Sequence, residues 1–263
     1  MIRVGVLGAG GRMGATVCEA VHGDDDLSLV VAVDPSYSGL DLRTVTGVDA
    51  GIRIAGGPAA LERGAVQVVV DFSHRAAAMD NLRWCAEHGV HAVVGTTGFT
   101  DDDMAAFDAM FTRSNCVIAP NFAIGAVLMM HFAEVAAPYF DSAEIIELHH
   151  ENKLDAPSGT AVHTAQRMAE ASKDWTPDPT TSELIEGARG GVGPADIHIH
   201  SVRLRGLVAH QEVLLGTAGQ TLTLRHDSID RTSFMPGVVL AVKKVADRPG
   251  VTVGLEALLD LPG

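Results

Sequence analysis

Hydrophobic residues in the first half of the chain switch repeatedly between strand-like and helix-like spacing. Residues 2–7 alternate apolar and other side chains, and residues 13–21 then place apolar side chains at helical intervals until Gly23. A period near 2 predicts a strand, and a period near 3.6 predicts a helix. Further short β-branched runs and an alanine-rich helical segment follow, at 27–33, 66–72, 76–88, 90–94 and 116–119. Strands alternating with helices favour βαβ units and a parallel sheet.

The pattern changes after residue 121. A long apolar segment at 122–140 is typical of a helix, and residues 174–196 are rich in proline and glycine, which predicts a surface loop. The remaining expected elements are strands at 143–148, 197–204, 210–215 and 220–226, helices at 160–171 and 234–246, and an apolar tail at 251–261. Closely spaced strands joined by glycine turns favour a mainly antiparallel or mixed sheet of four strands.

These patterns predict an α/β protein with two domains. Residues 1–121, completed by residues 234–263, are expected to form a Rossmann-type domain with a parallel sheet. Residues 122–233 are expected to form a second, α+β domain. The length of 263 residues fits one large domain or two modest ones.

Small and polar residues follow the end of each predicted strand in the first domain. They are Gly8-Ala9-Gly10, Asp34, Ser73-His74, Gly95-Thr96-Thr97-Gly98 and Pro120-Asn121. In an open parallel sheet the carboxyl ends of the strands form the ligand crevice. Any one of these groups fits an ordinary turn, but all of them together predict a bound ligand at this edge.

The glycine-rich stretch after the first strand is typical of a dinucleotide-binding loop. Its sequence is Gly8-Ala9-Gly10-Gly11-Arg12-Met13-Gly14, and it opens a predicted helix. Glycine lets the backbone approach a pyrophosphate, whose charge is favoured at a helix N-terminus. Asp34 follows the second strand, 34 − 14 = 20 residues after the last glycine. An acidic residue at this spacing binds the ribose hydroxyls, so residues 8–14 and Asp34 are predicted to bind a dinucleotide.

Asp34 also bears on the choice of cofactor. A carboxylate accepts hydrogen bonds from both ribose hydroxyls and repels a 2′-phosphate. Pro35 follows it, where an arginine would be needed to hold that phosphate, and Arg12 can contact either a 2′-phosphate or the pyrophosphate. We therefore expect NADH to be preferred and NADPH to be accepted as well.

The densest polar cluster spans residues 147–160, from a strand end to a helix start. Ser158-Gly159-Thr160 can present a hydroxyl and backbone N–H groups to a substrate carboxylate, although an ordinary N-cap also fits. His149 and His150 titrate near neutrality and can transfer a proton. Lys153 supplies a positive charge for a carboxylate or a developing anion. The cluster predicts proton transfer on an anionic substrate.

Metal and serine-hydrolase chemistry are not indicated. Adjacent His149 and His150 point apart on a strand, with no His-x-x-x-His or cysteine pair to complete a metal site. His198 and His200 are interpreted as surface or structural residues. The chain has no Gly-x-Ser-x-Gly sequence for a nucleophilic serine.

Charge and cysteine content narrow the class further. The chain carries 19 Lys and Arg against 33 Asp and Glu, a formal charge of −14, which opposes binding to nucleic acid or anionic membranes. No long apolar stretch or leader is apparent, so we expect neither a membrane span nor a signal peptide. Cys18, Cys85 and Cys116 lie among apolar residues and are expected to be buried, reduced thiols in the cytoplasm.

The polar cluster closely resembles the signature of the 4-hydroxy-tetrahydrodipicolinate reductase family, long called the dihydrodipicolinate reductases. The matching residues are Glu147-Leu148-His149-His150-x-x-Lys153-x-Asp155-Ala156-Pro157-Ser158-Gly159-Thr160-Ala161. Other blocks are similar in order, at Gly8 to Gly14, Asp71-Phe72-Ser73, Gly95 to Phe99, Ala119 to Phe122 and His210 to Phe234. The resemblance covers essentially the whole chain.

The resemblance implies a nicotinamide-binding Rossmann domain and a second domain that binds substrate and assembles a homotetramer. The implied reaction is the reduction of a cyclic dicarboxylate with loss of water, in the diaminopimelate route to lysine. His149 matches the proton donor, and Lys153 matches a second catalytic residue. The implied contacts are His150, Gly159 and Thr160 with substrate, and Gly95, Thr96, Thr97, Ala119, Pro120, Asn121 and Phe122 beside the nicotinamide.

Two positions depart from the family pattern. Arg75 stands where a proline is expected after Asp71-Phe72-Ser73, and Pro35 stands where an arginine is expected after the acidic residue. Two other functions share the glycine loop and stay open at this point. One is another small amino-acid dehydrogenase with the same two-domain plan, and the other is a non-catalytic dinucleotide sensor.

Overall fold

The computed structural model describes residues 1–261. The chain divides into two compact units, which are described separately. Unit 1 comprises Met1–Ile124 together with the C-terminal segment that begins at Arg231. Unit 2 comprises Gly125–Asp230.

Unit 1 is built on a six-stranded sheet in which every pairing is parallel. Its strands are β1 (Ile2–Leu7), β2 (Leu27–Val33), β3 (Val68–Asp71), β4 (His91–Val94), β5 (Cys116–Ile118) and β11 (Val251–Val253). The strand order is β11-β5-β4-β3-β1-β2. The chain therefore leaves β1 in one direction for β2 and then returns to its other side for β3. Ligands of open α/β sheets bind at the carboxyl ends of the strands beside such a reversal.

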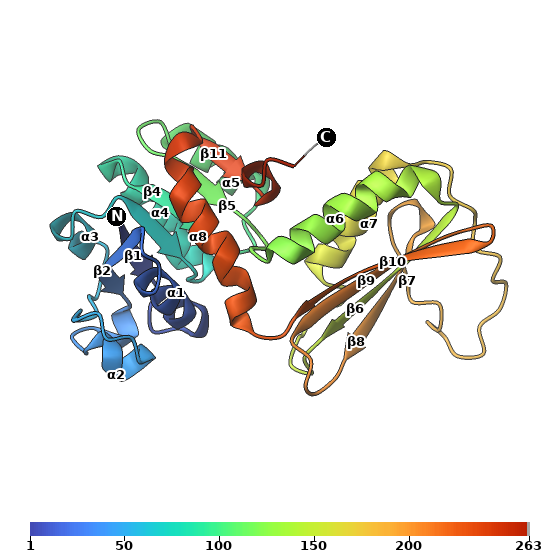
Figure 1. The fold of residues 1–263 in the computed structure, drawn as a ribbon, viewed down its shortest axis with the longest axis horizontal. Helices are drawn as coiled ribbons and strands as arrows, with labels where there is room; N and C mark the ends of the chain where they lie inside the picture. The colour runs from blue at the N-terminus through green and yellow to red at the C-terminus, as the bar shows by residue number, and fades with distance from the viewer. Residues whose placement is uncertain (262–263) are drawn as a thin grey trace. The chain divides into compact units, whose positions relative to one another are not determined.

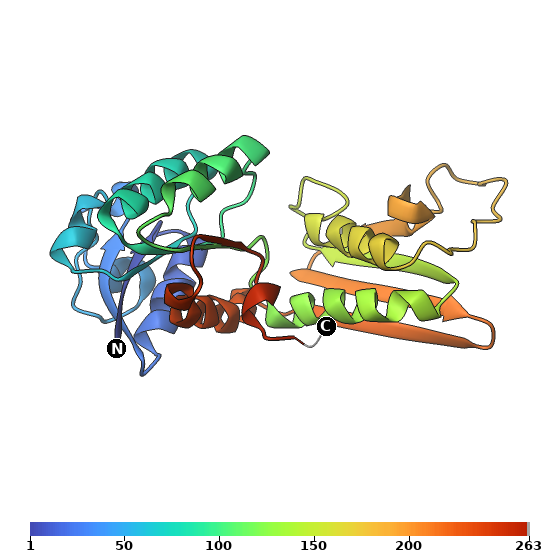
Figure 2. The same cartoon turned by 90° about the horizontal axis from the view of Figure 1, so that it is seen from above.

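Helices cover both faces of this sheet, as Figure 2 shows. They are α1 (Arg12–His22), α2 (Leu42–Thr46), α3 (Ala59–Arg63), α4 (Arg75–His88), α5 (Asp101–Met110) and α8 (Met235–Lys244). Helices α4 and α5 lie on one side, where Leu82 and Phe107 are buried against Val69 of the central strands. Helices α1 and α8 contact each other on the opposite side. This arrangement confirms the predicted Rossmann-type domain.

Unit 2 contains a five-stranded mixed sheet with the order β10-β9-β6-β8-β7. The strands are β6 (Ser142–His149), β7 (Gly191–Val192), β8 (His198–Arg203), β9 (Ala209–Thr217) and β10 (Gln220–Ser228). β6 and β8 run parallel, and the other pairs are antiparallel. The additional strand β7 was not expected, because two residues that begin with glycine carry no hydrophobic periodicity.

Two helices pack against the sheet of unit 2 (Figure 1). They are α6 (Ile124–Ala136), whose first residue belongs to unit 1, and α7 (Gly159–Ala171). Met129 of α6 and Met168 of α7 share a core with Ile145 of the central strand. The predicted helix at 122–140 is wrong at both ends. Pro138 follows α6 in a short 3₁₀ turn, where proline interrupts helical hydrogen bonding.

The remaining helical segments are short 3₁₀ turns. They are η1 (Pro35–Tyr37), η2 (Ala137–Tyr139), η3 (Pro194–Asp196), η4 (Arg231–Phe234), η5 (Val245–Asp247) and η6 (Glu256–Leu258). Within residues 1–261, none of the helices combines the length and apolar character needed to cross a bilayer.

Candidate active site

Backbone geometry dominates the glycine loop between β1 and α1. Gly8 has a φ of +72°, and its carbonyl oxygen accepts a hydrogen bond from the Gly11 N–H at 3.0 Å. A Cβ at position 14 would lie 2.0 Å from that same carbonyl oxygen, so only glycine fits there. Gly11 caps α1 without any side-chain hydrogen bond. The helix N-terminus is therefore not satisfied by a protein side chain, which suits an anionic ligand.

Asp34 lies at the carboxyl end of β2 and reaches the glycine loop. Its Oδ2 accepts a hydrogen bond from the Gly10 N–H at 3.0 Å, and its Oδ1 accepts one from the Ser36 N–H at 3.0 Å. The ring of Tyr37 lies so close to Gly10 that a Cβ there would be 2.1 Å from the ring. Arg12 is exposed at the first position of α1.

The other predicted cofactor residues follow β4 and β5 in the same sheet. Thr96 is buried, and its hydroxyl donates to the carbonyl oxygen of Ser73 at 2.9 Å. The ring of Phe72 packs against Gly95, where a Cβ would lie 2.0 Å from the ring. The centroids of Phe72 and Phe122 are 5.7 Å apart. The structure thus places residues 95–97 and 119–122 at the same strand edge as the glycine loop.

These residues fit a dinucleotide. The uncapped N-terminus of α1 suits a pyrophosphate, and the Asp34 carboxylate beside it suits ribose hydroxyls.

In unit 2 a buried carboxylate organises the candidate catalytic cluster. Glu147 of β6 has no exposed surface. Its Oε2 lies 2.5 Å from His149 Nδ1 and accepts from Arg203 Nη1 at 2.9 Å. Its Oε1 accepts from Arg203 Nη2 at 2.8 Å and from the Ser158 N–H at 3.1 Å. Burial without such partners would be costly for a charged group.

His149 occupies the end of β6 and is mostly enclosed. Its side chain is 16% exposed. Burial lowers the pKa of His149 below its usual value, and the positive charges of Lys153 and Arg203 lower it further, whereas the carboxylate of Glu147 raises it. The ring is therefore held between one anion and two cations.

Lys153 is linked to the same cluster through Asp155. Its Nζ donates to both carboxylate oxygens of Asp155, at 2.9 and 2.8 Å. Arg203 Nη2 donates to the Asp155 carbonyl oxygen at 2.6 Å. The loop that carries Lys153 is thus tied to the arginine that holds Glu147.

The turn before α7 bears on whether Ser158 is an N-cap or a group that contacts substrate. The Ser158 hydroxyl accepts a hydrogen bond from the Ala161 N–H at 3.2 Å, and the residue is buried. The hydroxyl is therefore an N-cap in this structure. Gly159 is exposed and Thr160 is half-buried at the first turn of α7. His150 is exposed, and its Nδ1 accepts a hydrogen bond from the Asn152 N–H at 3.2 Å.

Sequence reasoning missed the roles of Glu147 and Arg203. Glu147 and His149 are two positions apart on a strand and therefore share a face. That spacing could have indicated their contact. Arg203 gave no comparable signal, because it reaches Glu147 through the parallel pairing of β6 with β8.

The departure at Arg75 has a local explanation. Its guanidinium pairs with Asp103 at 2.5 Å. Asp103 also completes a capping box with Thr100 at the start of α5. A hydrogen bond from the Thr100 backbone and then the ion pair with Arg75 lower the pKa of Asp103. Arg75 therefore connects the first turns of α4 and α5.

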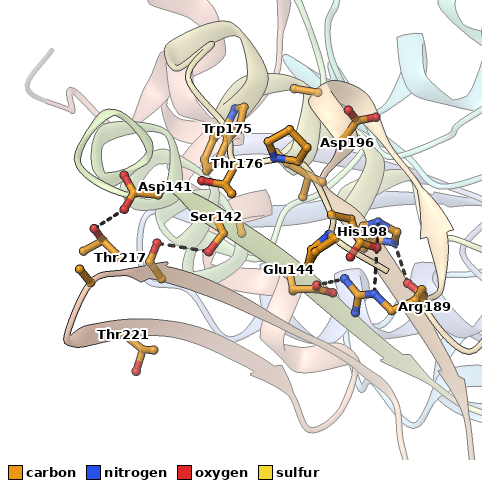
Figure 3. A pocket seen from close by; sticks show the side chains of 18 of the residues that line it. Asp141, Ser142, Glu144, Trp175, Thr176, Arg189, Asp196, His198, Thr217 and Thr221 are labelled. Atoms are coloured by element: carbon orange, nitrogen blue, oxygen red, sulfur yellow. Dashed lines mark hydrogen bonds and ion pairs between the residues drawn. The ribbon is translucent and has the colours of Figure 1, made fainter. Parts of the chain in front are cut away.

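A cavity of about 500 Å³ lies at the other end of β6 and contains none of the predicted site residues (Figure 3). Glu144, Asp178 and Arg189 form an ion-pair network beside it. His198 is buried against Asp178, and His200 Nε2 lies 2.5 Å from Glu144. These contacts attach the loop before β7 to the sheet.

The three cysteines are free and buried. Burial raises the pKa of Cys18 to about 12, and it also raises the pKa of Cys85 and of Cys116. The thiolate is the reactive form of cysteine, and a raised pKa keeps these side chains as unreactive thiols near neutral pH.

Family models match both halves of the chain. The model for dihydrodipicolinate reductase, N-terminus, matches residues 2–122, and the model for dihydrodipicolinate reductase, C-terminus, matches residues 125–259. A 4-hydroxy-tetrahydrodipicolinate reductase from Mycolicibacterium vanbaalenii is 54% identical over 99% of this chain and 100% of its own length. One from Cutibacterium acnes is 53% identical with the same coverage.

Comparison with solved structures supports the same family. A dipicolinate-bound dihydrodipicolinate reductase from Paenisporosarcina sp. TG-14 has a TM-score of 0.86 and 40% identity, covering 98% of this chain and 100% of its own. An amine dehydrogenase from Mycobacterium smegmatis has a TM-score of 0.67 and 16% identity, covering 95% of this chain and 94% of its own, which shows a shared fold alone. The chain belongs to the dihydrodipicolinate reductase family.

Proposed function

We propose that this protein is a 4-hydroxy-tetrahydrodipicolinate reductase that uses a nicotinamide cofactor. The reaction yields tetrahydrodipicolinate with loss of water, in lysine and diaminopimelate biosynthesis. The observation that carries the proposal is the segment in which His149, Lys153 and the N-terminus of α7 follow one another directly. A proton donor, a cation and a helix N-terminus are what reduction of a dicarboxylate requires.

The cofactor binds unit 1 in this proposal. Residues 8–14 hold the pyrophosphate, Asp34 holds the ribose, and residues 95–97 and 119–122 lie beside the nicotinamide. The bound reduced nicotinamide supplies a hydride. Because the Asp34 carboxylate repels a 2′-phosphate and Pro35 offers no guanidinium, NADH is preferred and NADPH is accepted.

The substrate binds unit 2. The Paenisporosarcina protein binds dipicolinate, a planar dicarboxylate, and this chain has matching chemistry for two carboxylates. Lys153 pairs with one of them, and the backbone N–H groups of Gly159 and Thr160 receive the other. His150 makes a further contact. Ser158 supports the turn from beneath as the cap of α7.

His149 supplies the proton that completes the reduction. Loss of the ring hydroxyl as water gives a conjugated imine. Addition of a hydride to its carbon–carbon double bond moves electron density toward the ring nitrogen, and a nearby acid must neutralise that density with a proton. Lys153 holds the substrate in place for this step, which converts binding energy into orientation.

A coupled assay tests the activity. The product of the preceding synthase is generated in the cuvette, and NADH oxidation is followed by absorbance. We expect turnover by the purified protein and none without the synthase. Absence of turnover with freshly formed substrate, using correctly folded protein that binds NADH, would reject the reductase assignment.

Comparison of kcat/KM for NADH and NADPH tests the cofactor preference. We expect a higher value with NADH and a measurable one with NADPH. A strong preference for NADPH would contradict the role proposed for Asp34.

We also propose that the protein assembles as a homotetramer. Helices α6 and α7 cover one face of the unit 2 sheet, and the alternate residues Ile146, Leu148 and Leu214 are only partly buried on the other. Apolar sheet faces are normally covered. Light scattering should give four times the mass of one chain, and a monomer mass would refute the assembly.

The buried, reduced cysteines fit the cytoplasm as the compartment of the protein.

The two other functions are less well supported. A non-catalytic dinucleotide sensor needs no enclosed histidine paired with a buried carboxylate. Another amino-acid dehydrogenase would share the fold, as the 16% identical amine dehydrogenase does. It would not need the residues of the 147–161 signature.

A further inference from the structure

Several hydrogen bonds fix the orientation of the Glu147 carboxylate. Arg203 contacts both of its oxygens, at 2.9 and 2.8 Å, and the Ser158 N–H adds a third bond at 3.1 Å. The carboxylate is fully buried and cannot rotate without breaking several of these bonds. Its Oε2 lies 2.5 Å from His149 Nδ1.

This contact determines which ring nitrogen of His149 is available. An ionised carboxylate can only accept, so Nδ1 carries a hydrogen and Nε2 becomes the atom that gains or loses a proton. The neighbouring His150 is arranged in the opposite way. Its Nδ1 accepts the Asn152 N–H, so the neutral ring carries its hydrogen on Nε2.

On the basis of the reductase activity proposed above, we propose that Glu147, anchored by Arg203, is the positioning residue for His149. It fixes the ring with Nε2 as the proton-donating atom and keeps the imidazolium populated. Because Glu147 also holds the Ser158 N–H, the same carboxylate aligns the start of α7 with the proton donor. Glu147 itself does not contact the substrate.

The charges around His149 explain why its imidazolium form needs a neighbouring carboxylate. Lys153 from the following loop and Arg203 from β8 both face the ring and lower its pKa, in addition to burial. Glu147 on β6 is the carboxylate that opposes them. Its neutralisation should therefore release the proton from His149 at a lower pH.

The same strand provides a matched control. Glu144 contacts a histidine and an arginine, His200 and Arg189, each at 2.5 Å. Its side chain is 34% exposed, and it lies beside the cavity at the far end of β6 (Figure 3). Glu144→Gln removes the same charge from a similar network but leaves His149 unchanged.

The test combines two measurements on Glu147→Gln, Arg203→Gln and Glu144→Gln. The pKa and tautomer of His149 are followed in substrate-free protein by NMR of ¹⁵N-labelled histidine, with His149→Gln for assignment. The pH profile of kcat is followed in the coupled assay. In Glu147→Gln we expect the His149 pKa to fall by about one unit. The kcat should then fall by about tenfold above that pKa and recover as the pH is lowered.

Arg203→Gln separates positioning from general damage to the fold. It removes a cation and leaves the carboxylate, so the His149 pKa should rise, in the opposite direction to Glu147→Gln. This variant alone carries the test if Glu147→Gln does not fold. In Glu144→Gln the pKa of His149 should equal that of the wild type.

The outcomes distinguish this inference from the activity on which it rests. An unchanged His149 pKa and tautomer in Glu147→Gln would overturn the positioning role, and so would a His149 pKa that does not rise in Arg203→Gln. Missing turnover by the wild type would overturn the reductase assignment instead, while the NMR titration would still report on Glu147.

Discussion

The two units build their candidate sites from different materials. In unit 1 the candidate site consists mainly of backbone. It contains the glycine loop, the N-terminus of α1 and one carboxylate, that of Asp34. In unit 2 the site is a network of charged side chains around Glu147, His149 and Arg203. The first arrangement is sensitive to volume, whereas the second is sensitive to charge and proton occupancy.

The two candidate sites therefore have different structural requirements. A dinucleotide is recognised by close backbone approach, so one added methyl group in the glycine loop should weaken its binding. A proton donor must hold a particular pKa and orientation, so it needs partners that are buried and fixed. Substitutions at the two candidate sites should separate sensitivity to volume from sensitivity to charge.

The largest effect is expected for His149→Gln. Removal of the proton donor should lower kcat by about 10²–10⁴-fold, or roughly 3–5 kcal/mol of transition-state stabilisation. The Kd for NADH, measured by fluorescence titration, should stay unchanged because the loop of unit 1 is untouched. Wild-type turnover in this variant would remove His149 from the role.

Gly14→Ala should have the opposite signature. Its Cβ would lie 2.0 Å from the Gly8 carbonyl oxygen, so the loop must shift. We expect NADH binding to weaken by at least about tenfold, while the pH profile of kcat is retained. Gly23→Ala at the other end of α1 is the control, because its Cβ would meet the Glu19 carbonyl oxygen at 3.4 Å and the Ala20 carbonyl oxygen at 4.0 Å, both without severe overlap. Equal NADH affinities in the two variants would contradict the steric argument.

Lys153→Ala should affect substrate and leave cofactor binding intact. Loss of a charge-assisted contact to a carboxylate is expected to lower kcat/KM for the substrate by about 10- to 100-fold, with both parameters affected. Lys173→Ala, an exposed lysine just after α7, is the control. A normal KM and kcat in Lys153→Ala would show that another group binds the carboxylate.

The smallest effect is expected for Asp34→Asn. The amide keeps an oxygen acceptor for the loop but removes the charge that repels a 2′-phosphate. The ratio of kcat/KM with NADH to that with NADPH should fall by about tenfold, or ~1.4 kcal/mol. A ratio that does not change would show that Asp34 does not discriminate between the cofactors.

Much of the fold followed from the sequence because its signals are local. Alternation at residues 2–7, helical spacing after Gly14 and the acidic residue at 34 are patterns within one βαβ unit. The end of α6 was misplaced because the apolar run continues beyond the proline that ends the helix. The short β7 was missed because it consists of two residues without a pattern.

The sequence alone predicted where the two candidate sites lie: a cofactor site at the glycine loop and Asp34, and a substrate site in the segment from His149 to Thr160. The contact between Arg203 and Glu147 depends instead on the tertiary structure. Arg203 lies 54 positions beyond His149, is its neighbour in the β6–β8 register, and binds the Glu147 carboxylate. A pattern along the chain reports neighbours within one strand or helix. Partners from separate strands are chosen by sheet pairing and by the requirement that a buried charge be neutralised, and neither has a period in the sequence.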